Sequence, residues 1–599
     1  MNLKDENIII AGGGHAGIEA ALAISRMGFK ATIITLDPKA LGRMSCNPAI
    51  GGLAKGHLVK EIDALGGAMG FFADKACLQF KTLNKSKGRA VWSPRAQVDK
   101  LQYANYINNF VKTNKNINII KGEVVDFDTI RGAVSHVILK SKKKIKCSAL
   151  IITAGTFLNG LIHIGDTTFR AGRMGEIPST GLTEALSKHG FTTGRLKTGT
   201  PPRLLSNSID WSKTEISKGE KNPFPFSTNT KRPFFPRNDN CNIVNTSTRT
   251  HKHILKKMHL SAMFSGKIEG VGPRYCPSIE DKVFRFSNKP FHQLFLEPEW
   301  VNSKQIYLNG FSTSLPKETQ TSALKTIPAF KNVELIRPGY AIEYDYLVPS
   351  QLKRSLESKT VLGLFSAGQI NGTSGYEEAA AQGLIAGINA CKYIENKKSF
   401  VLTRDQAYIG VLIDDLTTKE INEPYRMFTA SAEHRLLLRS DTAVLRLSPT
   451  AIKHNLLTKV QASTYEEFIN NYNNVMSILT KNQRKQNSIY KSILRGDISF
   501  LDLSNEKGFN SIPAEVLFSV ETFIKYKGYI IREEERIKKT KSLEEKIINV
   551  NFSYNKIYNL SNEAREKLTR LKPETLGQAS RIAGVNPSDV ASIAIALSK

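Results

Sequence analysis

The sequence predicts an α/β fold in which a Rossmann-type dinucleotide-binding domain carries an inserted α+β domain and an all-helical C-terminal domain. Three observations predict this class. A strand, a glycine turn, a helix and a strand occupy the first 36 residues, a stretch rich in Pro, Asn, Ser and Lys interrupts the middle, and charged helical patterns follow residue 400. The length of 599 residues indicates about four domain-sized segments. We place them at 1–203, 204–340, 341–400 and 401–599, the third being the return of the chain to the first domain.

The N-terminal unit consists of the apolar strand 8–11, the apolar-periodic helix 18–27 and the strand 32–34. Before the helix, Gly12-Gly13-Gly14-His15-Ala16-Gly17 contains the GxGxxG pattern. Glycines in this position let the backbone approach a pyrophosphate, which the helix N-terminus holds through its N–H groups. The pattern therefore predicts a dinucleotide site. Asp37 after the second strand is either a ribose ligand or a solvent-facing loop residue, and we interpret His15 as scaffold rather than catalyst.

Two later strands end in small residues. Strand 150–152 runs into Thr153-Ala154-Gly155-Thr156, and strand 361–365 runs into Ser366-Ala367-Gly368-Gln369 before a helix that starts at Tyr376. Such endings leave backbone open at the carboxyl edge of an α/β sheet, where ligands bind. The two segments resemble the second and third signatures of two-domain FAD proteins, so the pattern indicates a Rossmann-type FAD-binding domain more than a nicotinamide-only one.

The middle and the C-terminal third differ from this pattern. Residues 206–250 are predicted to be a loop-rich excursion from the inserted domain. Near the end, helices are expected at 574–582 and 587–597, joined by a turn that contains Gly584. The small residues of Gly577-Gln578-Ala579-Ser580-Arg581 suit close helix docking, and we expect this segment to be a partner surface.

The charge and the cysteines limit the class of function. Lys and Arg number 84 against 54 Asp and Glu, a net charge of +30, which indicates a polyanionic partner such as nucleic acid, unless it reflects a general lysine bias. The six cysteines form no CxxC pair, which excludes a zinc finger, a disulfide framework and a redox-CxxC disulfide reductase. No signal peptide or membrane-length apolar run is present, so we expect a cytoplasmic protein without a membrane anchor.

Four long strings identify the chain as similar to the MnmG (GidA) family of tRNA-modifying flavoproteins: Met44-Ser45-Cys46-Asn47-Pro48-Ala49-Ile50-Gly51-Gly52, Gly199-Thr200-Pro201-Pro202-Arg203, Gly272-Pro273-Arg274-Tyr275-Cys276-Pro277-Ser278-Ile279-Glu280-Asp281-Lys282 and Glu423-Pro424-Tyr425-Arg426-Met427-Phe428-Thr429. The resemblance implies FAD- and NADH-dependent addition of a carboxymethylaminomethyl or aminomethyl group at carbon 5 of the tRNA wobble uridine. It also implies methylenetetrahydrofolate as carbon donor, an MnmE-type GTPase partner, and a homodimer that joins this partner in a heterotetramer.

The same resemblance implies roles for particular residues. FAD is expected at Gly12, Gly13, Gly14, His15, Ala16, Gly17, Val124, Ser179 and Gln369, and NADH at Gly272, Pro273, Arg274, Tyr275, Ser278, Ile279, Glu280, Asp281, Lys282 and Phe286. Cys276 and Cys46 match the two functional cysteines proposed for the family. A thiolate is the side-chain group best suited to add to carbon 6 of uracil. The remaining cysteines, Cys77, Cys147, Cys241 and Cys391, are interpreted as packing or surface residues. Contacts with tRNA are expected at Arg203, Arg426, Arg435 and Arg439.

Some positions depart from the family pattern and leave alternatives open. Arg89 stands where proline is usual, and Ser431 and His434 stand where arginine and tyrosine are common, which bears on tRNA affinity.

A folate- and FAD-dependent tRNA uridine methyltransferase of the TrmFO type is the nearest rival, although that family lacks the long helical region after residue 400. A flavin-binding scaffold that docks RNA without turnover is the other alternative, which both retained cysteines disfavour.

Overall fold

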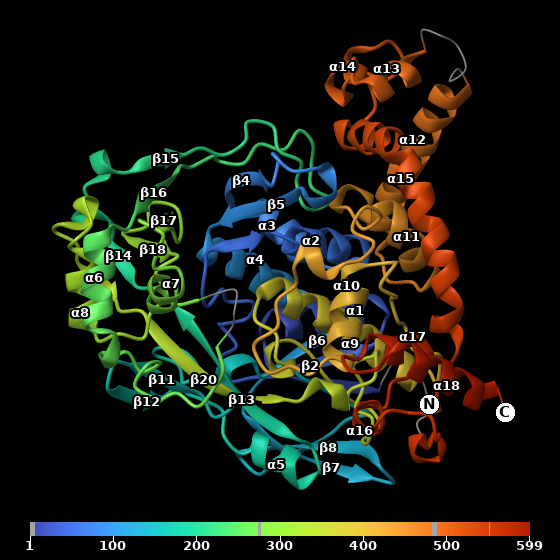
Figure 1. Ribbon diagram of the computed structural model, residues 1–599, viewed down its shortest axis with the longest axis horizontal. Coiled ribbons are helices and arrows are strands. Elements are labelled where there is room, and N and C mark those ends of the chain that lie inside the picture. Colours follow the sequence, from blue (N-terminus) through green and yellow to red (C-terminus); the bar gives the residue numbers. More distant parts are fainter. Residues whose placement is uncertain (1–5, 273–276, 482–487, 550, 599) are drawn as a thin grey trace.

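The structure is a computed structural model that describes residues 6–272, 277–481, 488–549 and 551–598. Figure 1 shows a central α/β body with the inserted domain on one side. A helical arm extends past the body on the other side, and a small helical bundle lies at the base of this arm.

The central sheet is parallel, has the strand order β21-β10-β1-β2-β6 and confirms the α/β class. Its strands are β1 (Asn7–Ala11), β2 (Lys30–Thr35), β6 (Ile117–Lys121), β10 (Ala149–Ile152) and β21 (Leu364–Ser366). Ile8, Ile9 and Ile10 of β1 are fully buried in the core of the body. The return strand begins three residues later than the predicted 361–365, because the Ser358 hydroxyl accepts the Thr360 and Val361 amides and holds a turn there.

Two helices pack closely on this sheet. Helix α1 (His15–Arg26) follows the glycine turn, and α9 (Tyr376–Ile394) follows the return strand. A Cβ atom added at Gly383 of α9 would lie 2.0 Å from the Ala16 carbonyl oxygen of α1. Glycine at this position therefore lets the N-termini of both helices face the same edge of the sheet.

Smaller sheets and helices complete the body. A three-stranded sheet contains β3 (Ala49–Gly51), β4 (Cys77–Leu83) and β5 (Ser93–Val98), and another contains β7 (Val124–Ile130), β8 (Ala133–Leu139) and β9 (Lys144–Lys146). Helices α2 (Lys55–Ala64), α3 (Met69–Lys75) and α4 (Lys100–Lys112) lie between these strands in the sequence, and α5 (Leu182–Lys188) follows them.

A four-stranded antiparallel sheet joins the body to the inserted domain. It contains β11 (Leu161–Ile164), β12 (Thr167–Arg170), β13 (Thr193–Thr200) and β20 (Tyr340–Leu347). Strands β13 and β20 pair over their full length, from Thr193 opposite Leu347 to Thr200 opposite Tyr340. The chain therefore leaves for the inserted domain and returns from it at one place.

The inserted domain has its own antiparallel sheet and its own hydrophobic core. The six strands are β14 (Arg203–Leu205), β15 (Glu215–Ser217), β16 (Cys241–Asn245), β17 (Gln293–Pro298), β18 (Gln305–Asn309) and β19 (Leu335–Arg337). Helices α6 (Thr248–Lys256), α7 (Ile279–Arg285) and α8 (Lys317–Leu324) cover it (Figure 1).

Residues 218–240 contain no helix or strand, as predicted, but they are not simply an excursion from the inserted domain. The Asp74 carboxylate of α3 accepts the Phe226 and Ser227 amides, both at 2.8 Å, and Phe226 is fully buried in the core of the body. The Gln79 amide of β4 also donates to the carbonyls of Ser217 and Asp239. Phe226 and these hydrogen bonds thus anchor this segment to the first domain.

From residue 400 on, the residues described are helical and contain no named strand, but they belong to three cores rather than one. Helices α10 (Tyr408–Thr418) and α11 (Ala443–Lys453) pack into the body. A second core forms the arm, with α12 (Lys459–Lys481), α13 (Ile489–Arg495), α14 (Phe500–Asn505) and α15 (Ala514–Glu545). The third is the terminal bundle of α16 (Asn562–Leu571), α17 (Leu576–Arg581) and α18 (Pro587–Ser598). Within the described ranges, no helix is both long and apolar enough to cross a membrane.

Helix α17 corrects the expectation that its small residues form a partner surface. A Cβ atom at Gly577 would lie 2.2 Å from Glu544 of α15, and Gln578 donates to Asp414 of α10 at 3.2 Å. Residues 576–579 are buried. These small residues dock α17 against its own chain.

Candidate dinucleotide and thiol site

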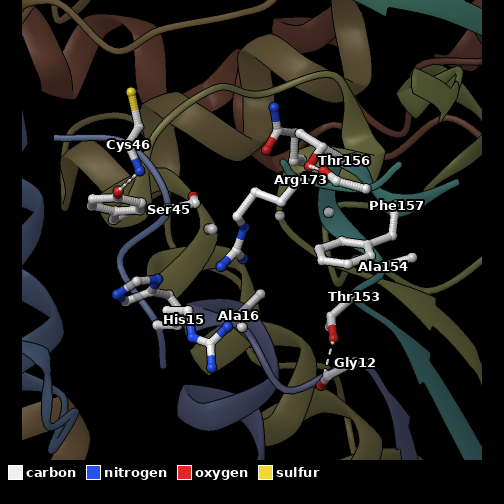
Figure 2. Close-up of a pocket in the computed structure, with 18 of the residues that line it drawn as sticks. Gly12, His15, Ala16, Ser45, Cys46, Thr153, Ala154, Thr156, Phe157 and Arg173 are labelled. Carbon is white, nitrogen blue, oxygen red and sulfur yellow. Dashed lines mark hydrogen bonds between the residues drawn. The ribbon is translucent and has the colours of Figure 1, made fainter. Parts of the chain in front are cut away.

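A cavity of about 370 Å³ lies at the carboxyl edge of the central sheet. The structure brings together in its lining most of the residues predicted for FAD, together with Cys46 and Arg426: Gly12, Gly13, Gly14, His15, Ala16, Val124, Ser179 and Gln369. Figure 2 shows Gly12, His15, Cys46 and Arg173 around this cavity. Gly17 and the described residues expected near NADH are not among the lining residues.

The glycines of the turn meet different steric limits. Gly12 has a φ of +122°, and a Cβ atom there would lie 2.5 Å from the Thr153 carbonyl oxygen. The Thr153 hydroxyl donates to the Gly12 carbonyl at 3.0 Å (Figure 2). At Gly17 a Cβ atom would lie 2.1 Å from the Gly12 carbonyl oxygen. At Gly14, the N-cap of α1, a Cβ atom meets nothing within 4 Å. The open space in front of this helix N-terminus fits a dinucleotide pyrophosphate.

His15 is part of an aromatic stack beside this turn. Its ring lies 4.6 Å from the Tyr376 ring and 5.7 Å from the Tyr103 ring. Burial, with the Arg173 charge, lowers the pKa of His15 to about 3, so the imidazole is neutral near pH 7. This packing supports the interpretation of His15 as scaffold.

Asp37 lies at the rim of the same cavity. Its carboxylate is half-exposed and lies 3.4 Å from the Arg43 guanidinium, which also pairs with Glu176 at 2.9 Å. The position is compatible with ribose contact and with a loop ion pair.

Cys46 lies in the loop between β2 and β3, where four groups hold it. Its amide donates to the Tyr376 hydroxyl at 2.5 Å, and its carbonyl accepts from Lys100 Nζ at 3.2 Å. Its Sγ is 3.1 Å from the Tyr307 hydroxyl and 4.0 Å from the Thr200 hydroxyl. The thiol therefore lies where β13 and β18 meet the first domain.

The other described cysteines differ from Cys46 in burial. Cys46 is partly exposed, whereas Cys77, Cys147, Cys241 and Cys391 are buried. Burial raises the pKa of the Cys147 and Cys241 thiols to about 12 and raises that of Cys77 and Cys391 as well. These four are packing residues. Cys276, Pro273, Arg274 and Tyr275 lie outside the described residues.

Charged side chains surround the backbone of Cys46. Glu299 accepts from Lys100 at 2.7 Å and from Arg203 at 3.4 Å. Burial lowers the pKa of Lys100 to about 8, although Glu299 opposes this shift. Burial favours the neutral form of Glu299, but Lys100 and Arg203 together hold the pKa of its carboxyl below the usual value.

Two of the four arginines predicted to contact tRNA are buried. Arg203 is 3% exposed and stacks on Tyr307, and Arg439 is 1% exposed and pairs with Asp441 at 3.0 Å. In this structure neither guanidinium is exposed for contact with a phosphate. Arg426 lies in the cavity wall and donates to Ser374 at 2.9 Å, whereas Arg435 is exposed.

Two of the three positions that depart from the family pattern face α15. Arg89 pairs with Glu521 at 2.9 Å and lies over the Phe518 ring. His434 lies 2.6 Å from Glu533. Arg404 Nη2 donates to the Ser431 carbonyl at 3.1 Å. Arg89 and His434 therefore join the body to the helical arm.

The segment expected near NADH is largely structural where it is described. Ser278 caps α7, and Ile279 is fully buried in the inserted core. The buried Glu280 carboxylate accepts from Ser261, Thr313 and the Ser314 amide, each at 3.0 Å. The Ile279 and Glu280 side chains therefore face the interior of the inserted domain, and NADH contact at these positions stays a prediction.

Sequence reasoning missed the acidic first turn of α9. Glu377 and Glu378 pair with Lys55 at 3.1 and 2.8 Å, and Glu377 also accepts the Gly51 amide. These contacts tie α9 to the segment that follows Cys46. The signal in the sequence was the acidic pair directly after Gly375-Tyr376.

A parallel sheet, a glycine turn at a helix N-terminus and a distant return strand define a dinucleotide-binding α/β protein. The sequence matches the family described as "Glucose inhibited division protein A" over residues 7–398, and "tRNA modifying enzyme MnmG/GidA C-terminal helical bundle" over residues 536–599. The chain therefore belongs to the MnmG (GidA) family of tRNA uridine 5-carboxymethylaminomethyl modification enzymes.

Individual relatives agree with this assignment. The MnmG enzymes of Thermodesulfovibrio yellowstonii and Karelsulcia muelleri are each 47% identical to this chain; the alignments cover 100% and 98% of this chain and 98% of each relative. A solved structure of Aquifex aeolicus GidA superposes with a TM-score of 0.92 at 44% identity, covering 99% of this chain and 100% of that chain.

Proposed function

We propose that this member of the family uses FAD, NADH and methylenetetrahydrofolate to install a carboxymethylaminomethyl or aminomethyl group at carbon 5 of the tRNA wobble uridine, together with an MnmE-type GTPase. One observation carries the proposal. A cavity with an open cradle at Gly14 also contains Cys46, a partly exposed thiol.

The cavity fits FAD in the chemistry of its residues. The α1 N-terminus and Gly14 would hold the pyrophosphate, with Val124, Ser179 and Gln369 along the walls. Bound FAD would supply hydride exchange with NADH. The stacked His15 and Tyr376 rings keep the turn rigid, which orients the cofactor.

The thiol suits activation of the uracil ring. When a thiolate adds to carbon 6, the sulfur lone pair forms the new bond and the electrons of the 5,6 double bond move to the carbonyl oxygen at carbon 4. Carbon 5 is then nucleophilic and forms the bond to the one-carbon group. When carbon 5 afterwards loses its proton to solvent, the electrons of that C–H bond restore the double bond and the thiolate leaves. Cys46 and Cys276 share this proposed role, and either could be the attacking residue.

The proposed partners follow from charge and from the family. A net charge of +30 favours tRNA, and Arg435 remains a surface contact candidate. A homodimer joined to the GTPase through the terminal bundle is the proposed assembly.

Mass spectrometry of wobble nucleosides in tRNA from cells with and without the gene tests this function. We expect loss of the 5-aminomethyl series when the gene is removed. Loss of 5-methyluridine instead would favour a TrmFO-type methyltransferase, and unchanged nucleosides would favour a scaffold without turnover.

A further inference from the structure

The Cys46 thiol contacts a phenol that belongs to the inserted domain. Tyr307 lies on β18, its hydroxyl is 3.1 Å from Cys46 Sγ, and its side chain is 3% exposed. Burial keeps the hydroxyl in one place, so the contact does not depend on a mobile surface side chain. The modification chemistry proposed above does not use this hydroxyl.

Arg203 organises the groups on this side of the thiol. Its guanidinium lies 4.9 Å from the centre of the Tyr307 ring, and it donates to the Thr200 hydroxyl at 2.6 Å. A cation over an aromatic face withdraws electron density from the ring. The Tyr307 hydroxyl is thereby made a better hydrogen-bond donor.

Two cations, one carboxylate and two phenols lie close to Cys46. Arg203 and Lys100 are cations on β14 and α4, and Glu299 after β17 balances one of them. Two phenols complete the surroundings, Tyr340 on β20 and Tyr376 on α9, and burial raises the pKa of both, so they are neutral. One net positive charge therefore lies beside the thiol.

We propose that Tyr307 donates a hydrogen bond to the Cys46 sulfur when this residue reacts with tRNA as a thiolate, so that the inserted domain completes the thiol site. A thiolate carries no proton, so the phenol must be the donor once the thiol proton has passed to solvent. The inference rests on the function proposed for Cys46. Tyr307 is a positioning residue because it acts through the sulfur.

The rate of iodoacetamide alkylation of Cys46 across a pH series tests this proposal. The full-length protein is used, and the alkylated Cys46 peptide is quantified by mass spectrometry, so that other thiols do not contribute. In Tyr307→Phe we expect the midpoint of the rate profile to rise by about one pH unit and the rate at pH 7 to fall about tenfold, because a hydrogen bond to an anion is lost. Tyr340→Phe is the matched control, since its hydroxyl accepts the Met174 amide at 3.4 Å. An unchanged or lower midpoint in Tyr307→Phe would overturn the proposal.

A second measurement covers the case in which Tyr307→Phe folds poorly. Replacing Tyr307 by 3-fluorotyrosine keeps the ring and makes the hydroxyl a stronger donor, so the midpoint should fall; a midpoint that stays in place would contradict donation. Modification of tRNA by Cys46→Ser distinguishes the proposed hydrogen bond from the proposed function of Cys46. If that variant is fully active while Tyr307→Phe still shifts the thiol, the proposed function of Cys46 is wrong and the hydrogen bond stands.

Discussion

The three glycines of the GxGxxG turn differ in why the structure needs glycine at their positions. Gly12 needs a positive φ, Gly17 needs a missing Cβ atom, and Gly14 needs neither, because its Cβ position is open. Gly14→Glu should therefore fold but place a carboxylate where the pyrophosphate binds. We expect flavin content to fall about tenfold or more, the effect of a loss of about 1.4 kcal/mol or more of binding energy. Absorbance of the purified protein measures it, and wild-type flavin content would refute the assignment of this turn.

Gly17→Ala is the contrasting variant. Its new methyl group would lie 2.1 Å from the Gly12 carbonyl oxygen, so the turn must shift. We expect a stability loss of about 1–3 kcal/mol rather than a selective loss of flavin.

The cysteines allow a graded test of the proposed chemistry. We expect Cys276→Ser to retain FAD, NADH oxidation and tRNA binding but to lose modification, because a serine hydroxyl lacks an accessible anion near neutral pH. Cys77→Ser changes a buried packing residue and should be nearly silent in the nucleoside assay. If Cys276→Ser modified tRNA at the wild-type rate while Cys46→Ser was inactive, the roles of the two cysteines would have to be exchanged. Full activity in both variants would rule out covalent activation by these cysteines.

The lowered pKa values of two buried histidines lead us to expect that the protein loses stability in acid. Burial lowers the pKa of His15 to about 3 and of His57 to about 4, below the ordinary 6.5 of the unfolded chain. The unfolded chain therefore binds more protons below pH 6.5, so stability is full above this pH and falls as the pH falls toward the folded values. Each histidine contributes up to about 1.4 kcal/mol per pH unit. The thermal midpoint should fall less between pH 7 and 5 in His57→Gln than in wild type. His136→Gln, which alters a half-buried histidine of β8, is the control.

At the scale of elements, local patterns predicted those parts whose neighbours are near in sequence. Strand β1, helix α1 and strand β2 are one continuous unit, so periodicity and the glycine turn sufficed. The anchoring of Phe226 by Asp74 and the contact of Tyr307 with Cys46 join residues more than 150 positions apart. No local pattern encodes such pairings. The burial of Arg203 was missed for the same reason, since its partner Glu299 lies 96 positions away in the sequence.

The terminal bundle is held to the body by a buried ionic contact. Asp414 accepts from Arg581 at 2.8 Å and from Arg404 at 3.1 Å. Removing Arg581 leaves Asp414 paired with Arg404, so we expect Arg581→Met to loosen the bundle by about 1–3 kcal/mol without unfolding the body. Faster hydrogen exchange confined to α16–α18 would show this effect. Exchange that rises equally in the central sheet would contradict it.

Deleting residues 550–599 tests the bundle as the partner element. Because the bundle has its own core, the central sheet should persist and flavin binding should be retained. Association with the GTPase should be lost in size-exclusion chromatography. A truncated protein that still co-elutes with the partner would refute the assignment.

At the scale of the whole molecule, the net charge of +30 predicts salt-dependent tRNA binding. Each phosphate neutralised releases counterions, so with about three such contacts the affinity should fall about twentyfold or more between about 50 and 200 mM salt. Filter binding across this range measures the slope. Arg435→Ala removes an exposed cation and should reduce the slope by about one, whereas Arg439→Ala removes a buried one and should lower stability instead. An affinity that stays flat with salt would mean that the positive charge reflects composition and not a tRNA-binding surface.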